Sequence, residues 1–264
     1  MKKEETRFAE GTLFEGMTSV RAVLQAYEAG IGDRRILRIL ADETKKKSRA
    51  KELGWLASKA GEMGFSIAFV PPIEIDAMST GTTHGGILAE CTERTIPPLT
   101  NADLKPDGFY VMLEGIEDPY NFGYAIRSLY ACGCDGVVLS PRNWMTAAGV
   151  VCRSSAGTSE LLPVYESDPA ESAKVFREQG YKVLCAGIRD SVSSFDCDMR
   201  RPVYLIVGGE KRGISAALLA QADAVVRIDY GRTFNGSLSA ASAAAVLGYE
   251  ILRQNRKELP HGGT

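Results

Sequence analysis

Residues 118–127 read Asp-Pro-Tyr-Asn-Phe-Gly-Tyr-Ala-Ile-Arg, and they decide the fold of the chain around them. They follow an apolar stretch, 109–113, that predicts a buried strand. Apolar residues then recur at helical spacing, which predicts a helix over 121–132. Asn121 stands where a helix N-cap is expected, and Arg127 falls off the apolar stripe. Polar side chains at such a strand-to-helix edge predict a ligand site of an open α/β fold.

The same alternation of strand and helix continues to the end of the chain. It implies a largely parallel sheet with helices on both faces. The further predicted strands are 136–139, 161–164, 182–186, 203–207 and 224–228, and the further helices are 146–152, 170–179, 216–222 and 239–254.

The N-terminal part predicts a smaller α/β unit, and a proline-rich polar stretch without periodicity separates it from the rest. Its predicted strands are 35–41, 65–70 and 86–91, and its helices are 20–30, 45–63 and 73–78. We therefore expect a flexible N-terminus (1–15), a first domain (16–93), a linker (94–107), a second domain (108–257) and a tail (258–264).

The composition is that of an ordinary globular protein, with 264 residues, 45% hydrophobic and 24% charged. The start of the chain does not resemble a signal peptide, and no apolar run is long enough to span a bilayer, so we expect a cytoplasmic protein without membrane contact. The six cysteines are scattered and there are two histidines, which predicts buried, reduced thiols and no metal site.

The net charge of −2 does not indicate a nucleic-acid binder, but a basic stretch runs through 34–51. Charge alone favours a solvated helix face there, with phosphate binding as the alternative.

Two further blocks have the same strand-to-loop character. In 203–215, an apolar strand opens into Gly208 and Gly209, which let the backbone approach a ligand, and Glu210 follows. Neither a P-loop nor a Rossmann fingerprint is present, so this block predicts a ligand loop or a tight turn. The helix within 225–250 is crowded with Ser and Ala, which suits a tight subunit interface or a cramped cofactor site.

Together the blocks resemble the SpoU/TrmH-type RNA ribose 2′-O-methyltransferases of the SPOUT superfamily. The stretch 118–127 is similar to that family's first motif, and 208–215 is similar to its second. Ser155-Ala-Gly157 with Leu161-Leu-Pro163 looks like the intermediate segment, and Ser237-Leu238 with 243–250 like the third motif. The N-terminal part resembles the family's RNA-substrate-binding module, including His84-Gly-Gly-Ile87.

The resemblance implies a trefoil-knotted α/β catalytic domain that binds S-adenosylmethionine among the knot loops. It also implies a homodimer built around the knot, with both subunits contributing to the site. The residues expected to hold the cofactor are Leu205, Val207, Gly208, Gly209, Ile228, Ser237 and Leu238.

The resemblance makes Arg127 the catalytic residue. Since arginine normally stays protonated, we expect Arg127 to orient the ribose 2′-hydroxyl and its phosphate. Asn121 would shape the first-motif loop, and Glu210 would orient an arginine or the loop backbone. The residues expected to contact RNA are Arg34, Arg35, Lys46, His84 and Arg153.

Two positions depart from the family pattern. The third motif usually continues Ser-Leu-Asn, whereas Ser239 follows here and the nearest asparagine is Asn235. Tyr124 stands where alanine is common. We expect methylation of a ribose in structured RNA, with ribosomal RNA favoured over transfer RNA. The alternatives are a transfer RNA enzyme, a non-catalytic RNA-binding relative and, more weakly, an α/β enzyme that uses another nucleotide.

Overall fold

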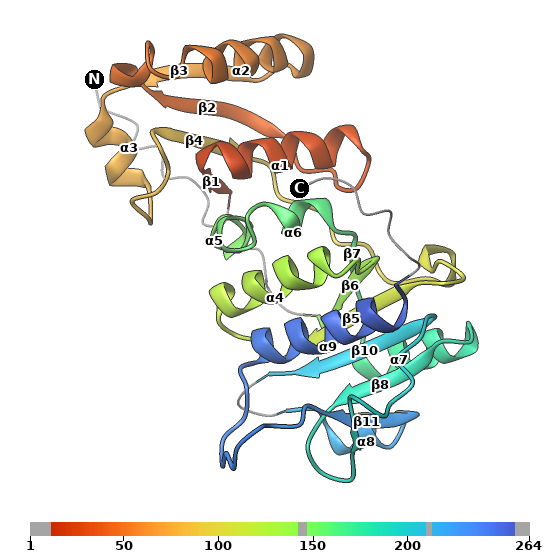
Figure 1. Cartoon of the computed structure of the whole chain (residues 1–264). Helices are drawn as coiled ribbons and strands as arrows, with labels where there is room; N and C mark the ends of the chain where they lie inside the picture. The colour runs from red at the N-terminus through yellow and green to blue at the C-terminus, as the bar shows by residue number, and fades with distance from the viewer. Residues whose placement is uncertain (1–11, 142–146, 210–212, 257–264) are drawn as a thin grey trace. The chain divides into compact units, whose positions relative to one another are not determined.

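A computed structural model describes residues 12–141, 147–209 and 213–256 of the chain (Figure 1). The chain divides into two compact units. Unit 1 comprises residues 1–95 and 143–161, and unit 2 comprises 96–142 and 162–264. Each unit has its own sheet.

Unit 1 is built on a four-stranded sheet in the order β1-β4-β2-β3. The β2 and β3 strands are parallel, whereas β4 pairs antiparallel with both β1 and β2. Val20 and Leu24 on the first helix pack with Ile39 of β2 in a common apolar core. The elements are β1 (Leu13–Glu15), α1 (Gly16–Glu28), β2 (Ile36–Asp42), a 3₁₀ turn (Glu43–Lys45), α2 (Ala50–Met63), β3 (Ser66–Val70), α3 (Pro72–Met78) and β4 (Ile87–Cys91).

The later segment 147–161 packs within unit 1, although the sequence analysis grouped it with 108–257. It carries α5 (Ala148–Ser154) and α6 (Thr158–Leu161), which lie against α1 (Figure 1). Cys152 is fully buried in the same core as Phe14. A Cβ atom at Gly149 would lie 2.0 Å from the carbonyl oxygen of Leu13. Apolar burial and this close backbone approach explain why the segment joins unit 1.

Unit 2 is built on a seven-stranded sheet in the order β7-β6-β5-β10-β8-β11-β9. Each pairing in this order is parallel, which confirms the predicted sheet type. The strands are β5 (Phe109–Glu114), β6 (Gly136–Leu139), β7 (Val164–Glu166), β8 (Lys182–Ala186), β9 (Val192–Ser193), β10 (Val203–Gly208) and β11 (Ala224–Arg227). The α-helices are α4 (Pro119–Ala131), α7 (Pro169–Glu178), α8 (Ala216–Leu219) and α9 (Ala240–Gln254).

Alternating residues of β10 face two different helical layers. Tyr204 packs in a core with Phe176 of α7 and Leu218 of α8. Leu205 and Val207 alternate with it and are also buried. On their side of the sheet, α9 contacts β10 and lies beside α4 (Figure 1). Because both faces of the central strand are covered, its sequence is apolar throughout.

The predicted elements differ from the observed ones where the segments are short. The sequence analysis missed β1, β9 and α6, because two to four residues are too few for a periodic pattern to emerge. The helix predicted over 45–63 begins at Ala50. Part of the predicted linker is ordered, since the Leu99 N–H donates to the carbonyl oxygen of Glu166 at the edge of the unit 2 sheet.

The six cysteines are free and buried, which confirms the prediction of buried thiols. Within the described ranges, no helix combines the length and the apolar character that crossing a bilayer would require.

Candidate active site

The carboxyl ends of β8, β10 and β11 lie side by side in unit 2, because these strands are parallel neighbours. The loops that follow them therefore meet at one edge of the sheet. They enclose a cavity of about 390 Å³. This is a suitable size for a small ligand or cofactor.

Most of the residues predicted to bind the cofactor line this cavity. Of the seven predicted residues, six line the cavity and Leu205 does not, since it lies fully buried within β10. The lining residues that were predicted are Val207, Gly208, Gly209, Ile228, Ser237 and Leu238. Most of the residues that the resemblance implied as cofactor contacts thus lie at one place in the structure.

The turn after β10 needs glycine at two successive positions. A Cβ atom at Gly208 would lie 2.6 Å from the carbonyl carbon of Gly213, and one at Gly209 would lie 2.1 Å from the carbonyl oxygen of Gly115. Gly213 also donates its N–H to the carbonyl oxygen of Gly209. Backbone therefore forms this cavity wall. Glu210, the predicted orienting carboxylate, lies outside the described residues.

The altered third motif keeps an ordered connection into α9. The Ser239 hydroxyl accepts a hydrogen bond from the Ser242 N–H at 3.2 Å and so caps the helix. The Leu238 N–H donates to the Tyr230 hydroxyl at 3.2 Å, and both residues line the cavity. Asn235 is exposed and outside the cavity lining. Ser239 therefore occupies the helix-capping position in this motif.

The small residues of α9 serve two purposes. Ala240 and Ala243 line the cavity, where larger side chains would occupy ligand space. Gly248 faces α4, since a Cβ atom there would lie 3.2 Å from a methyl group of Leu129. The expected crowding thus allows close packing of α4 and leaves room at the cavity.

The first motif forms the start of α4, but its cap differs from the prediction. Asp118, rather than Asn121, is the N-cap, and its carboxylate accepts hydrogen bonds from the N–H groups of Tyr120 and Asn121. Pro119 fixes the first helical position, which places Asn121 two residues inside the helix. The prediction of Asn121 as the cap was therefore wrong.

Arg127 lies on the exposed face of α4 and does not line the cavity. The opposite face of the helix is buried through Phe122, Ala125, Ile126 and Leu129, as the sequence pattern predicted. Within one chain, most of the predicted cofactor-binding residues therefore lie together at the cavity, and Arg127 is not among the residues that line it.

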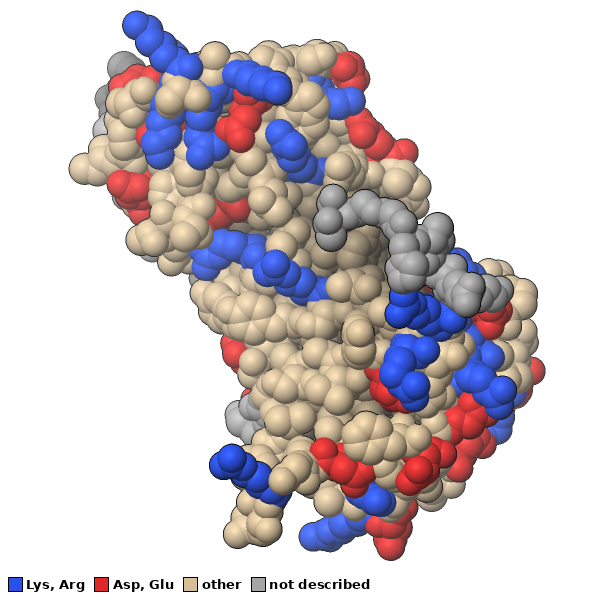
Figure 2. Space-filling model, viewed as in Figure 1, with Lys and Arg blue, Asp and Glu red and all other residues tan. Residues whose placement is uncertain are grey.

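The predicted RNA-contacting residues lie in unit 1 with different exposures. Figure 2 shows lysine and arginine side chains gathered over the region of α2 and β3. Arg35 and Lys46 are exposed, and the Lys46 ammonium lies 4.1 Å from the centre of the Phe69 ring. These two side chains are accessible to a polyanion.

Three of the residues predicted to contact RNA instead pair with carboxylates within unit 1. Arg34 is 5% exposed and its Nε donates to a carboxylate oxygen of Glu160 at 3.0 Å, so the structure does not support an RNA contact there. His84 is buried, with its Nε2 3.2 Å from a carboxylate oxygen of Asp76. The Arg153 guanidinium is paired with Glu15.

The sequence analysis missed the cavity wall that follows β8. Gly187, Ile188 and Arg189 line the cavity, as does Tyr230 from the loop after β11. The signal was available, because a predicted strand ends at Ala186 in a sheet expected to be parallel.

Among the described residues, no group of three His, Cys, Asp or Glu side chains is arranged to hold a metal ion.

Comparison with protein families assigns both parts of the chain. The model of the SpoU rRNA Methylase family matches residues 108–249. The chain belongs to this family. A second model, described as RNA 2′-O ribose methyltransferase substrate binding, matches residues 13–97 of this SpoU-family protein. The resemblance inferred from the motifs is confirmed, and the protein is an RNA methyltransferase.

Relatives and solved structures agree with the family assignment. A protein of Mycobacterium ulcerans named as an uncharacterized tRNA/rRNA methyltransferase is 29% identical over 270 residues, which cover 97% of this chain and 83% of the relative. An AdoMet-bound rRNA methyltransferase from Sinorhizobium meliloti has a TM-score of 0.75 at 22% identity, covering 93% of this chain and 88% of that one.

A second AdoMet complex, the SpoU methyltransferase AviRb from Streptomyces viridochromogenes, has a TM-score of 0.73 at 22% identity. The superposition covers 92% of this chain and 91% of AviRb. These structures share the fold of this SpoU-family protein.

Proposed function

We propose that this protein transfers the methyl group of S-adenosylmethionine to a ribose 2′-hydroxyl in structured RNA, with ribosomal RNA favoured over transfer RNA. The observation that carries the proposal is the cavity in unit 2, whose lining contains Val207, Gly208, Ile228, Ser237 and Leu238. The two AdoMet complexes that share this fold support the choice of cofactor.

The residues around the cavity fit this cofactor. Apolar side chains such as Val207, Ile228 and Leu247 suit the flat face of an adenine ring. The hydroxyls of Tyr230 and Ser237 and the backbone at Gly208–Gly209 offer polar partners for a ribose and an amino acid. When bound, S-adenosylmethionine supplies an electrophilic methyl group.

The chain contributes mainly by positioning the acceptor oxygen. A methyl transfer requires the 2′-oxygen to approach in line with the bond that breaks, so orientation is the principal demand. Arg127 has a rigid, charged group that can bind a phosphate and orient the adjacent hydroxyl. Asn121 would hold the start of α4 near the substrate, and Glu210 would orient an arginine or the loop backbone.

A homodimer is part of the proposal, because Arg127 lies outside the cavity lining of its own chain. The adjacent helices α4 and α9 expose Tyr124 (50%), Val246 (42%) and Tyr249 (65%). Exposed apolar side chains on neighbouring helices support a contact with a second copy. A partner subunit would then bring its own Arg127 to the cavity.

The capping role of Ser239 favours catalysis over the non-catalytic alternative. That alternative rested on the missing asparagine of the third motif, but the Ser239 hydroxyl caps α9 and the loop before it is hydrogen-bonded. An ordered cavity wall supports cofactor binding.

The decisive test combines cofactor binding with methyl transfer. Calorimetry with S-adenosylmethionine should detect binding, and labelled cofactor should mark RNA from cells that lack the protein. We expect Arg127→Ala to bind the cofactor like the parent and to lose at least about a hundredfold in transfer rate. Arg177→Ala, an exposed change on α7, is the control and should retain both activities.

Full transfer activity in Arg127→Ala would refute the catalytic assignment. Absence of cofactor binding at millimolar concentration would instead favour the RNA-binding alternative. Mapping ribose methylation in total RNA with and without the protein distinguishes ribosomal from transfer RNA.

A further inference from the structure

The loop between β8 and β9 forms a fixed wall of the cavity. At its start, the Gly187 N–H donates to the carbonyl oxygen of Val226 at 2.9 Å. At its end, the Ser191 hydroxyl donates to the carbonyl oxygen of Ile188 at 2.7 Å, and Nη1 of Arg227 donates to the carbonyl oxygen of Ser191 at 2.6 Å. Ile188 and Arg189 are therefore presented at the cavity by a loop that is tied at both ends.

Arg189 is unlike its neighbours in the cavity wall. Among the described residues that line the cavity, it has the only charged side chain. The rest are apolar or glycine, apart from Tyr230 and Ser237. Arg189 is also exposed, so it stands where the cavity opens to solvent. Within the described ranges, its guanidinium forms no ion pair or hydrogen bond.

We propose that Arg189 binds the carboxylate of the methionine part of S-adenosylmethionine. This inference rests on the proposed function and adds a residue that sets the orientation of the cofactor. A guanidinium binds a carboxylate through two parallel hydrogen bonds, which fixes direction as well as adding energy.

The charges of the cofactor limit the possible orientations. S-adenosylmethionine has a positive sulfonium and a positive ammonium group, and its carboxylate is its single negative group. A cation at the mouth would repel the sulfonium unless the carboxylate lies between them. Arg189 thus favours the methionine end at the mouth and the adenine against the apolar wall of Val207, Ile228 and Leu247.

Two ligands that differ in the methionine carboxylate test the proposal. Calorimetry would compare S-adenosylmethionine with 5′-methylthioadenosine, which has the adenosine and sulfur but no amino-acid group. We expect Arg189→Gln to weaken S-adenosylmethionine about tenfold and to leave 5′-methylthioadenosine unchanged. Decarboxylated S-adenosylmethionine should not be weakened by the substitution, because it lacks the carboxylate and keeps only the positive sulfonium and amine.

The matched control is Arg232→Gln, which changes another exposed arginine near the cavity but outside its lining. It should alter the affinity of none of the three ligands. Equal weakening of all three by Arg189→Gln, or unchanged S-adenosylmethionine binding, would overturn the role of Arg189. Failure of the parent protein to bind S-adenosylmethionine would instead refute the proposed function.

Discussion

Unit 1 and unit 2 are both α/β units, yet they differ in whether their ion pairs are buried or exposed. In unit 1, charged groups are buried against segments far away in the sequence. Arg34 and Glu160 are each 5% exposed in their side chains and are paired at 3.0 Å. Arg94 is also buried, its Nη1 donates to the carbonyl oxygen of Ser159, and burial lowers its pKa.

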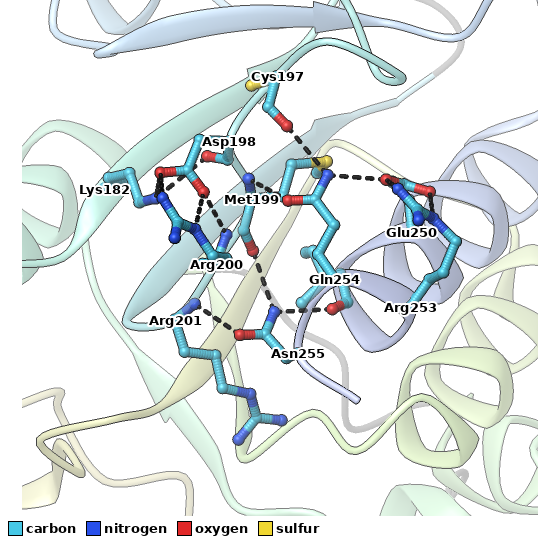
Figure 3. Close-up of polar contacts among 11 residues, drawn as sticks. Lys182, Cys197, Asp198, Met199, Arg200, Arg201, Glu250, Arg253, Gln254 and Asn255 are labelled. Atoms are coloured by element: carbon cyan, nitrogen blue, oxygen red, sulfur yellow. Dashed lines mark hydrogen bonds and ion pairs between the residues drawn. The ribbon is translucent and has the colours of Figure 1, made fainter. Parts of the chain in front are cut away.

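In unit 2, a prominent ion-pair cluster lies at the surface. Figure 3 shows Asp198 between Lys182 and Arg200, with distances of 2.8 Å and 2.7 Å. The side chains of Gln254 and Asn255 nearby hold the backbone of 197–201 through hydrogen bonds. The cavity of the same unit is apolar on most of its wall.

This difference separates structural charges from functional candidates. A buried, paired guanidinium such as that of Arg34 stabilises the fold only while its partner is present. Exposed arginines such as Arg127 and Arg189 are accessible to a phosphate or a carboxylate. The basic residues of unit 1 therefore divide into internal ones and a smaller accessible set that includes Arg35 and Lys46.

The largest loss of folding stability is expected from a substitution in unit 1. Replacing Glu160 with Ala should lower the free energy of unfolding by about 3–5 kcal/mol, because it leaves the Arg34 guanidinium buried without its carboxylate. Urea denaturation measures this loss. Glu178→Ala, an exposed change on α7, should have almost no effect.

A double variant makes this prediction specific to the charge. Arg34→Met combined with Glu160→Leu should recover most of the lost stability, since both charges are then absent. A single Glu160→Ala variant as stable as the parent would contradict the buried pair and remove the contrast between the units.

A smaller effect on stability, caused by buried cysteines, is expected in both units. Burial raises the pKa of Cys91 in unit 1 and of Cys185 in unit 2 to about 12. Each thiol stays neutral in the folded protein while the unfolded chain loses its proton above about pH 9, so stability is lost as the pH rises from 9 to 12.

We expect Cys185→Ala to flatten this decline by about 1.4 kcal/mol per pH unit. Denaturation curves at pH 8, 9 and 10 under reducing conditions would measure it, with Cys91→Ala giving the same change of slope. Parallel pH profiles for the variants and the parent would show that the thiols are not held neutral.

The smallest effect is expected at the surface cluster of unit 2. Hydrogen bonds from Arg200 and Lys182 hold the pKa of the Asp198 carboxyl below its usual value. The contribution of Asp198 to the free energy of unfolding is therefore present near neutral pH and lost as the pH falls. Because these side chains are largely solvated, Asp198→Asn should move the unfolding midpoint at pH 7 by less than about 2 °C. Thermal unfolding tests this, and a larger drop would make the cluster resemble the buried pair of unit 1.

The sequence predicted most of the sheet of unit 2, and many residues that the family resemblance implied as cofactor contacts line its cavity. Apolar runs identified the strands, and residues at their carboxyl ends, such as Gly208 and Ile228, line the cavity because parallel strands end at a common edge. Arg189 escaped notice because nothing local distinguishes it from any exposed arginine. Its place in the wall depends on β8 lying between β10 and β11.

The sequence by itself determined the alternating elements, the family motifs and the glycines that let the loops close around the cavity. Only the tertiary structure decided which polar groups are internal. Arg34 and Arg35 are neighbours in one extended segment, yet the first is buried and the second exposed. The partner of Arg34 is Glu160, 126 positions away, and no local pattern specifies a carboxylate at that distance. Burial of a charge depends on that partner, because an unpaired charge would be too costly to remove from water.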